Sequence, residues 1–235
     1  MENDHSTSGE PGLHAAPPDA RERLLDAAES LIYAGGIHAT GVDAIVRTAG
    51  AARKSFYTWF ESKDALVVAA LQRRDERWMR WFIDGTLARG RTPRARLLAM
   101  FDLLRDWFVS DGFHGCAFLN AAGEIASPED PVRIVAREHK ARLLAFVCEA
   151  CDAFAASIGA DRRFAERLAR QWLVLIDGAI GVALVSGEAD AADDARAAAQ
   201  QLLEAAAGRV SGRSSRRSTK RPPARRAARQ TGEKA

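Results

Sequence analysis

An all-α fold is predicted for this chain by two observations. Apolar residues recur at helical spacing along nine successive segments, and glycine, proline or a capping side chain separates each segment from the next. No window alternates apolar and polar residues over enough length to predict a strand. With 235 residues and 47% hydrophobic content, the chain can form a small head and a larger body.

Three short helices are predicted near the start of the chain. Asp19 followed by Glu22 has the form of a capping box, which places the first helix start at Asp19. Glycines end the first two helices, so the three are expected at about residues 19–35, 42–49 and 52–60. In the third, the aromatic residues expected to face inward are Phe56, Tyr57 and Phe60.

Six further helices are predicted in the rest of the chain. They begin after capping residues or prolines and are expected at about residues 62–82, 92–111, 116–126, 131–157, 161–185 and 188–207. Residues 85–90 begin and end with glycine and are expected to form a loop.

Residues Val42 to Phe60 meet the requirement of a helix-turn-helix, two short helices joined by a tight turn that contains glycine. Arg53 and Lys54 are expected on the outside of the second helix, where they suit base-edge acceptors or phosphate oxygens. An ordinary solvated surface is the alternative. Local charge alone favours it, because Arg21 to Leu66 contains six basic and six acidic residues.

The spacing of three segments decides between these interpretations: Thr40-Gly-Val-Asp-Ala-Ile-Val-Arg-Thr-Ala-Gly50, Phe56-Tyr-Thr-Trp-Phe-Glu-Ser-Lys63 and Asp64-Ala-Leu66. Together they resemble the tetracycline-repressor (TetR) family of one-component regulators. The resemblance implies a nine-helix protomer whose first three helices bind DNA and whose long fourth helix leads to a ligand-binding, dimerising body. The positions that usually touch DNA would be Arg47, Ala52, Arg53, Lys54, Tyr57, Thr58, Trp59 and Lys63. Ala51-Ala-Arg-Lys54 and Trp59 depart from the common family pattern, so no operator sequence is transferred.

Four segments are expected on this basis: a disordered arm at 1–18, a helix-turn-helix domain at 19–66, a ligand-binding and dimerisation domain at 67–208 and a basic disordered tail at 209–235. The tail has ten basic residues against one acidic residue and therefore carries +9, while the remainder carries −6. A basic appendage of this kind favours polyanionic partners.

The body is expected to hold a small-molecule pocket. Phe113 to Glu124, followed by Glu138-His-Lys140, is similar to a subgroup of the family that shares a Gly-Cys and an Asn…Glu pattern. Apolar surface with a few polar groups is typical of ligand sites. The residues predicted to line the pocket are Phe101, Leu104, Trp107, Phe108, Phe118, Asn120, Glu124, His139, Phe146 and Trp172. At each position a filled core with hydrogen-bonded polar groups is the alternative.

A continuous apolar face on the helix predicted at 161–185 suits a two-fold, four-helix interface. The predicted dimer contacts are Trp172, Leu175, Ile176, Ala179, Ile180 and Ala183. Within one chain the same face could instead be core, and the family resemblance favours the dimer.

Three cysteines are too few for a disulfide scaffold. Cys148 and Cys151 fall about one turn apart on one predicted helix face, without a second Cys/His pair at metal-ligand spacing. They are expected to be buried small hydrophobes rather than a zinc site, with redox sensing as the alternative. Neither a metal nor a cofactor is expected.

A cytoplasmic DNA-binding repressor, acting as a homodimer and released by a small molecule, is the predicted function. Its expected partners are operator DNA, a second copy of the chain and an unidentified effector, with no membrane. An architectural DNA-binding protein driven by the basic tail is one alternative. An enzyme is the other, and no enzyme is expected, because His139, Glu124 and Cys116 are its only candidate residues and they form no nucleophile-base-orienter set.

Overall fold

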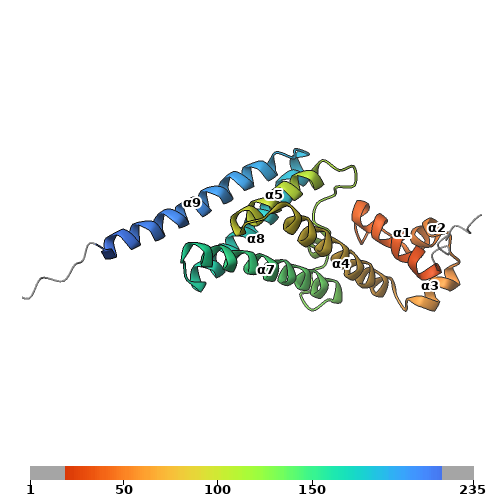
Figure 1. Cartoon of the computed structure of the whole chain (residues 1–235). Helices are drawn as coiled ribbons and strands as arrows, with labels where there is room; N and C mark the ends of the chain where they lie inside the picture. Colours follow the sequence, from red (N-terminus) through yellow and green to blue (C-terminus); the bar gives the residue numbers. More distant parts are fainter. Residues whose placement is uncertain (1–18, 219–235) are drawn as a thin grey trace, which may run out of the picture. The chain divides into compact units, whose positions relative to one another are not determined.

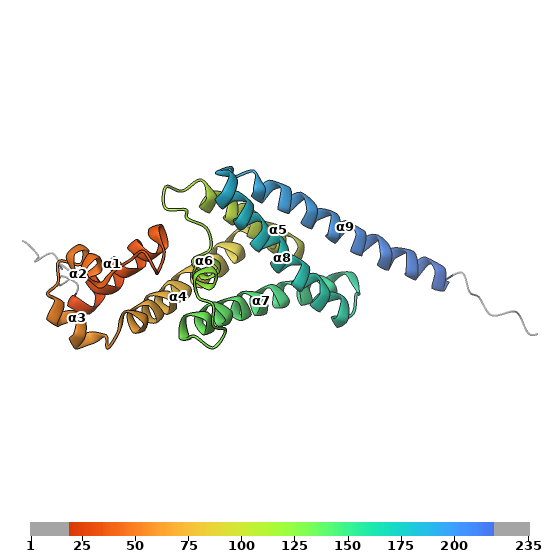
Figure 2. The same cartoon turned by 180° about the vertical axis from the view of Figure 1, so that it is seen from behind.

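The computed structural model describes residues 19–218, with side chains to residue 208, and within this range the chain forms helices and no strand (Figures 1 and 2). The helices are α1 (Ala20–Gly35), α2 (Val42–Thr48), α3 (Arg53–Trp59), α4 (Lys63–Arg89), α5 (Pro93–Phe108), α6 (Ala117–Glu124), α7 (Pro131–Ile158), α8 (Arg162–Ser186) and α9 (Ala191–Ser218). The predicted all-α fold of nine helices is confirmed for the described range. The predicted arm at 1–18 and the tail from 219 onward lie outside the described residues.

Capping residues set several boundaries as the sequence predicts. The side chains of Asp19, Thr92 and Asp161 each accept a backbone N–H bond in the first turn of the helix that follows. Gly36 ends α1 with a φ of 91°, a backbone conformation that favours glycine.

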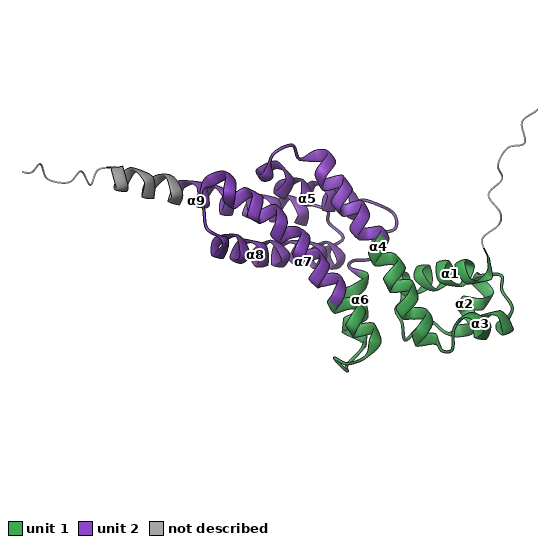
Figure 3. Cartoon of the chain, turned by 60° about the horizontal axis from the view of Figure 1, so that its bottom comes forward, with its two compact units in different colours: residues 1–76, 117–137 green, residues 77–116, 138–235 purple. Residues whose placement is uncertain are grey.

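The described chain divides into two compact units (Figure 3). The first contains residues 19–76 and 117–137, and the second contains residues 77–116 and 138–218. In the first unit α1 packs against α2 and α3, and in the second α5, α8 and α9 pack together. The chain passes from one unit to the other within α4, between Cys116 and Ala117, and within α7. The functional boundary expected after Leu66 stays a prediction.

Two predicted helix ends are wrong. The loop expected at 85–90 is largely helix, because α4 continues through Gly85 to Arg89. A Cβ at Gly85 would lie 2.7 Å from Leu103 Cδ2 of α5, so this glycine permits close helix packing instead of ending the helix. At the other end of the chain, α9 continues past the expected end at Ala207 to Ser218.

Among the described residues one long helix, α8, has an 18-residue window with a mean hydropathy as high as 1.6. Its length and composition would allow it to cross a membrane. The core helix of a soluble protein can have the same length and composition. The inward face of α8 packs against α5 and α9 within the second unit.

Candidate nucleic-acid interface

Two buried side chains orient the short helices α2 and α3. Ile45 of α2 and Phe56 of α3 are both fully buried in the core of the first unit, which they share with Leu24 and Leu25 of α1. Between the two helices, Gly50 has a φ of 57°, which glycine adopts without steric cost. The local sequence therefore forms the predicted pair of helices joined by a tight turn.

The outward face of α3 carries most of the residues predicted to contact DNA. Arg53, Lys54 and Thr58 are exposed, and Ala52 is exposed at the N-cap. The ring residue Tyr57, predicted to face inward, is 54% exposed, so that prediction is wrong. Successive helix residues are separated by about 100°, so Tyr57 cannot share the inward direction of Phe56. Trp59, at 49% exposure, adds a second outward aromatic ring.

Arg53 forms an ion pair with an acidic residue of α2. Its Nη1 is 2.6 Å from the Asp43 carboxylate of α2, and both side chains are more than half exposed. A hydrogen bond with Tyr57 and the charge of Asp43 raise the pKa of Arg53 above its usual value. Sequence reasoning missed Asp43, whose position in the exposed first turn of α2 was the available signal.

Lys63 has a structural contact that the sequence did not reveal. Its ammonium donates to the carbonyl oxygens of Ile37 at 2.7 Å and Thr40 at 2.9 Å, in the turn between α1 and α2. An ammonium has three donors, so one remains for the phosphate that was predicted as its partner. Arg47, near the end of α2, is exposed, which leaves its predicted DNA contact sterically available.

Comparison with known proteins supplies the family. Residues 24–70 match the family of bacterial regulatory proteins described as the tetR family. A solved TetR transcriptional regulator from Streptomyces avermitilis is 32% identical, with a TM-score of 0.69, over 80% of this chain and 98% of that one. The chain belongs to the TetR family of transcriptional regulators. A family member from Streptomyces coelicolor is similar at 28% identity, with a TM-score of 0.72, over 80% of this chain and 96% of that one.

The repressor NemR of Escherichia coli K12 is 28% identical over 116 residues, which are 49% of this chain and 58% of NemR. The chain thus matches less than two thirds of the length of the curated relatives. These partial matches show similarity to HTH-type transcriptional regulators.

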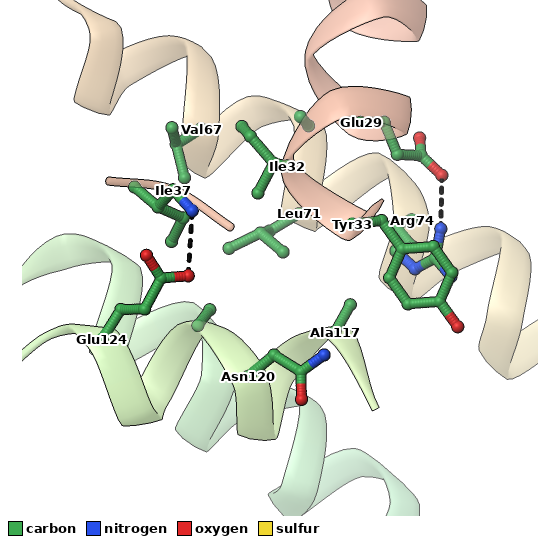
Figure 4. Close-up of a pocket in the computed structure, with 12 residues that line it drawn as sticks. Glu29, Ile32, Tyr33, Ile37, Val67, Leu71, Arg74, Ala117, Asn120 and Glu124 are labelled. Carbon is green, nitrogen blue, oxygen red and sulfur yellow. Dashed lines mark hydrogen bonds and ion pairs between the residues drawn. The ribbon is translucent and has the colours of Figure 1, made fainter. Parts of the chain in front are cut away.

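Only two of the residues predicted for the TetR ligand pocket line the hollow found in the first unit. It measures about 360 Å³, part of it open to solvent, and lies among α1, α4 and α6 (Figure 4). Asn120 and Glu124 of α6 belong to its lining. Its other polar residues are Glu29, Tyr33 and Arg74, and the Arg74 guanidinium lies 3.6 Å from the Tyr33 ring centroid.

Other predicted pocket residues gather in the second unit as an aromatic cluster. Trp78 stacks on Phe82 at 4.8 Å between ring centroids and meets Trp107 and His139 edge-on at 5.9 and 5.3 Å. Phe146 meets Phe82 at 6.1 Å. The remaining predicted pocket residues, all buried, are Phe101, Leu104, Phe108, Phe118 and Trp172. Sequence reasoning missed Trp78 and Phe82, which lie one turn apart on α4.

His139 is the polar member of this cluster. It is 1% exposed, and burial lowers its pKa below the usual value, although a hydrogen bond with Cys116 acts in the opposite direction. His139 is therefore neutral at neutral pH. Also in the second unit, the fully buried Trp172 packs against Phe101 at 5.4 Å between ring centroids, and its indole N–H has no hydrogen-bond partner.

The face of α8 predicted as a dimer seam is core within the protomer. Five of its residues are at most 4% exposed, and only Leu175 is half-buried; the five are Trp172, Ile176, Ala179, Ile180 and Ala183. These side chains therefore belong to the core of one chain, which is the alternative that the sequence left open. Their inward position makes them unavailable to a partner.

Cys148 is half-buried and Cys151 fully buried, and both are free thiols. Burial raises the pKa of Cys148, and it raises the pKa of Cys151 to about 12. Cys151 is thus protonated at neutral pH, which opposes thiolate chemistry. Among the described residues no group of three or more His, Cys, Asp or Glu side chains is arranged to hold a metal ion.

Proposed function

We propose that this TetR-family regulator is a cytoplasmic repressor that binds a two-fold symmetric operator as a homodimer and is released by a small molecule. The observation that carries the proposal is the outward face of α3. Its cations and aromatic rings project from a helix of seven residues that Phe56 holds against the core. A short exposed helix after a tight turn is the form of helix that enters the major groove.

The chemistry of this face suits direct readout. An arginine donates two hydrogen bonds to the O6 and N7 atoms of guanine, so Arg53 is proposed to read a base once it leaves Asp43. Lys54, Tyr57 and Trp59 supply donors for bases or phosphates. Asp43 would oppose indiscriminate phosphate binding, since its carboxylate repels the DNA backbone wherever Arg53 has no better partner.

An exposed apolar stripe on α8 supports the homodimer. Val174, Val182 and Val185 are 71%, 57% and 88% exposed, and the glycine at 178, between the first two, leaves room for a close approach. Val174, Gly178 and Val182 follow i, i+4, i+8 spacing and lie on one side of the helix. Two copies joined here in a symmetric helix pair would carry two recognition helices, as a two-fold operator requires.

Release by a small molecule requires that the molecule bind one arrangement of the heads better than the other. The pocket among α1, α4 and α6 supports such a role through its apolar lining of Ile32, Leu71 and Val67 and its few polar groups. Because coupling is reciprocal, saturating operator must change the affinity of the true effector by the factor with which the effector changes operator affinity.

Selection of DNA from a random pool by the purified protein tests the proposal. The expected result is an inverted repeat whose half-sites are centred about 34–36 Å, or one helical turn, apart, or a multiple of that spacing. Selected DNA without a repeat would exclude the two-fold model. Turnover of a compound without DNA would favour the enzyme instead.

Removal of residues 219–235 separates the repressor from the architectural alternative. This segment contains six basic residues and one acidic residue, so its loss should flatten the dependence of log affinity on log salt by up to about 0.9 for each phosphate no longer contacted. In a sequence-reading repressor, affinity for operator and for random DNA should fall together and keep their ratio. If nearly all DNA binding disappears with the tail, the architectural protein is the better description.

A further inference from the structure

The last residue of α6 holds the turn that leads from α1 into α2. Glu124 Oε1 accepts a hydrogen bond from the Ile37 N–H at 2.8 Å (Figure 4). Its Oε2 accepts one from the His38 N–H, also at 2.8 Å. Both carboxylate oxygens are therefore engaged by one turn. Hydrogen bonds from backbone N–H groups to a carboxylate are stronger than those between neutral groups.

The turn is shaped to receive this carboxylate. Gly36 has a φ of 91°, and a Cβ at Gly36 would lie only 2.9 Å from Glu124 Oε1. The carbonyl oxygens of Ile37 and Thr40 accept bonds from Lys63, so the turn is joined to α6 through its N–H groups and to the start of α4 through its carbonyl groups.

The segment before α6 is held within the second unit. Gly115 has a φ of 79°, and a Cβ there would meet Leu184 Cδ2 of α8 at 2.6 Å. Cys116 is buried, and it is hydrogen-bonded with His139 of α7. The next residue, Ala117, begins α6. One helix of eight residues therefore connects a segment packed in the second unit to a carboxylate that holds a turn of the first.

We propose that Glu124 is a positioning residue for DNA recognition, because its carboxylate holds in place the turn through which α1 leads into α2. The turn leads directly into α2, and Ile45 of α2 shares a core with Phe56 of α3. Movement of the turn therefore moves the helix that carries Arg53. This inference rests on the proposed function, because it concerns how the proposed DNA-reading helix is held in place.

Graded variants of Glu124 in the full chain test the inference. Glu124→Gln retains the size of the side chain but only one oxygen acceptor, whereas Glu124→Ala removes both. Glu129→Gln and Glu129→Ala are matched controls, since they remove the same charge from an exposed residue of the same unit. Two quantities are measured: amide hydrogen exchange at Ile37 and His38, and the ratio of the Kd for random duplex to the Kd for the selected operator at one salt concentration.

Exchange at Ile37 and His38 should become about tenfold faster for each carboxylate hydrogen bond lost. The operator preference should fall about 2- to 30-fold, with Glu124→Ala below Glu124→Gln, while the Glu129 variants keep the wild-type ratio. The ratio is insensitive to the uniform effect of one lost acidic charge and to the fraction of active protein, so a loss of stability alone does not change it.

Faster exchange with an operator preference equal to that of the Glu129 controls would overturn the inference, because the contact would then be structural only. Unchanged exchange in Glu124→Ala would also overturn it. If Glu124→Ala does not fold, Glu124→Gln decides by the same two measurements. A wild-type chain that selects no DNA sequence would defeat the proposed function itself, and the exchange measurement would still report whether Glu124 holds the turn.

Discussion

Helices α3 and α8 differ in how clearly their side chains indicate which face of the helix points outward. In α3, with seven residues, Phe56 is buried, and the neighbouring Tyr57, Thr58 and Trp59 are exposed. In α8, with 25 residues, apolar side chains occupy both faces: Trp172 is fully buried and Val182 is 57% exposed. One inward aromatic residue therefore defines the outward face of the short helix, whereas periodicity alone does not tell which apolar face of the long one meets its own protomer.

The largest effect is expected at the inward side of α3. Phe56→Ala should lower the free energy of unfolding of the first unit by about 3–5 kcal/mol, because it empties a fully buried site. Denaturant titration followed by circular dichroism would measure this. The adjacent Tyr57→Ala should change stability by less than about 0.5 kcal/mol and reduce operator affinity instead. Equal loss of stability in both variants would contradict the assignment of the two faces.

On α8 the outward face is tested by introducing a charge. Val182→Glu should leave the protomer folded and shift the protein from dimer to monomer, since burial of an unpaired carboxylate in an apolar interface costs several kcal/mol. Light scattering measures the mass. Val109→Glu, at a residue that is 63% exposed on the end of α5, is the matched control and should stay dimeric. A dimeric Val182→Glu protein would place the interface elsewhere.

Arg53 and its partner Asp43 give opposite expectations on one surface. Arg53→Ala should weaken operator binding by about 1–3 kcal/mol if the guanidinium makes a bidentate base contact. Asp43→Asn should tighten binding to all duplex DNA, because it removes a negative charge beside the proposed contact surface, and it should lower the preference for operator. Fluorescence anisotropy with operator and random duplexes measures both. An unchanged ratio of the two affinities in Asp43→Asn would show that Asp43 takes no part in discrimination.

The smallest effect concerns His139, whose pKa is lowered by burial. Above a pH of about 6.5, the usual pKa of histidine, both the folded and unfolded chains carry it neutral and no stability is lost. Below that pH the unfolded chain binds the proton first, so stability should fall by up to about 1.4 kcal/mol per pH unit as the pH falls.

Urea titrations of wild type and His139→Gln between pH 7 and pH 5 measure this difference in slope. The variant should lose the His139 contribution and show a shallower slope than the wild type. A wild-type slope in His139→Gln would mean that other groups account for the pH dependence.

Signals from adjacent residues correctly predicted the helices and turns of the helix-turn-helix region. Asp19 and Gly50 act through their own backbone neighbourhood, so their roles as cap and turn can be deduced from a few adjacent residues. Gly85 shows the limit of this reasoning, because its role depends on Leu103 of another helix. A glycine that permits close packing and a glycine that ends a helix have the same sequence signal.

The candidate site residues show the same difference between signals from adjacent residues and contacts between distant ones. The exposed residues of α3 lie near one another in sequence and in space, so a motif locates them together. Asn120 and Glu124 line a pocket with α1 and α4, whereas His139 lies in the aromatic cluster of the second unit. Sequence reasoning grouped these three by polarity on apolar helices, but polarity carries no information about which residues meet after folding.

The sequence by itself determined the helical class, the caps and the pair of short helices with its outward cations, since each depends on periodicity or on contacts within a few residues. Only the tertiary structure decided that Lys63 and Glu124 hold the same turn, and that Trp172 and Ile180 face inward while Val182 faces outward. These outcomes depend on contacts between residues far apart in the chain. Their geometry is set when the helices pack, and no local pattern encodes it.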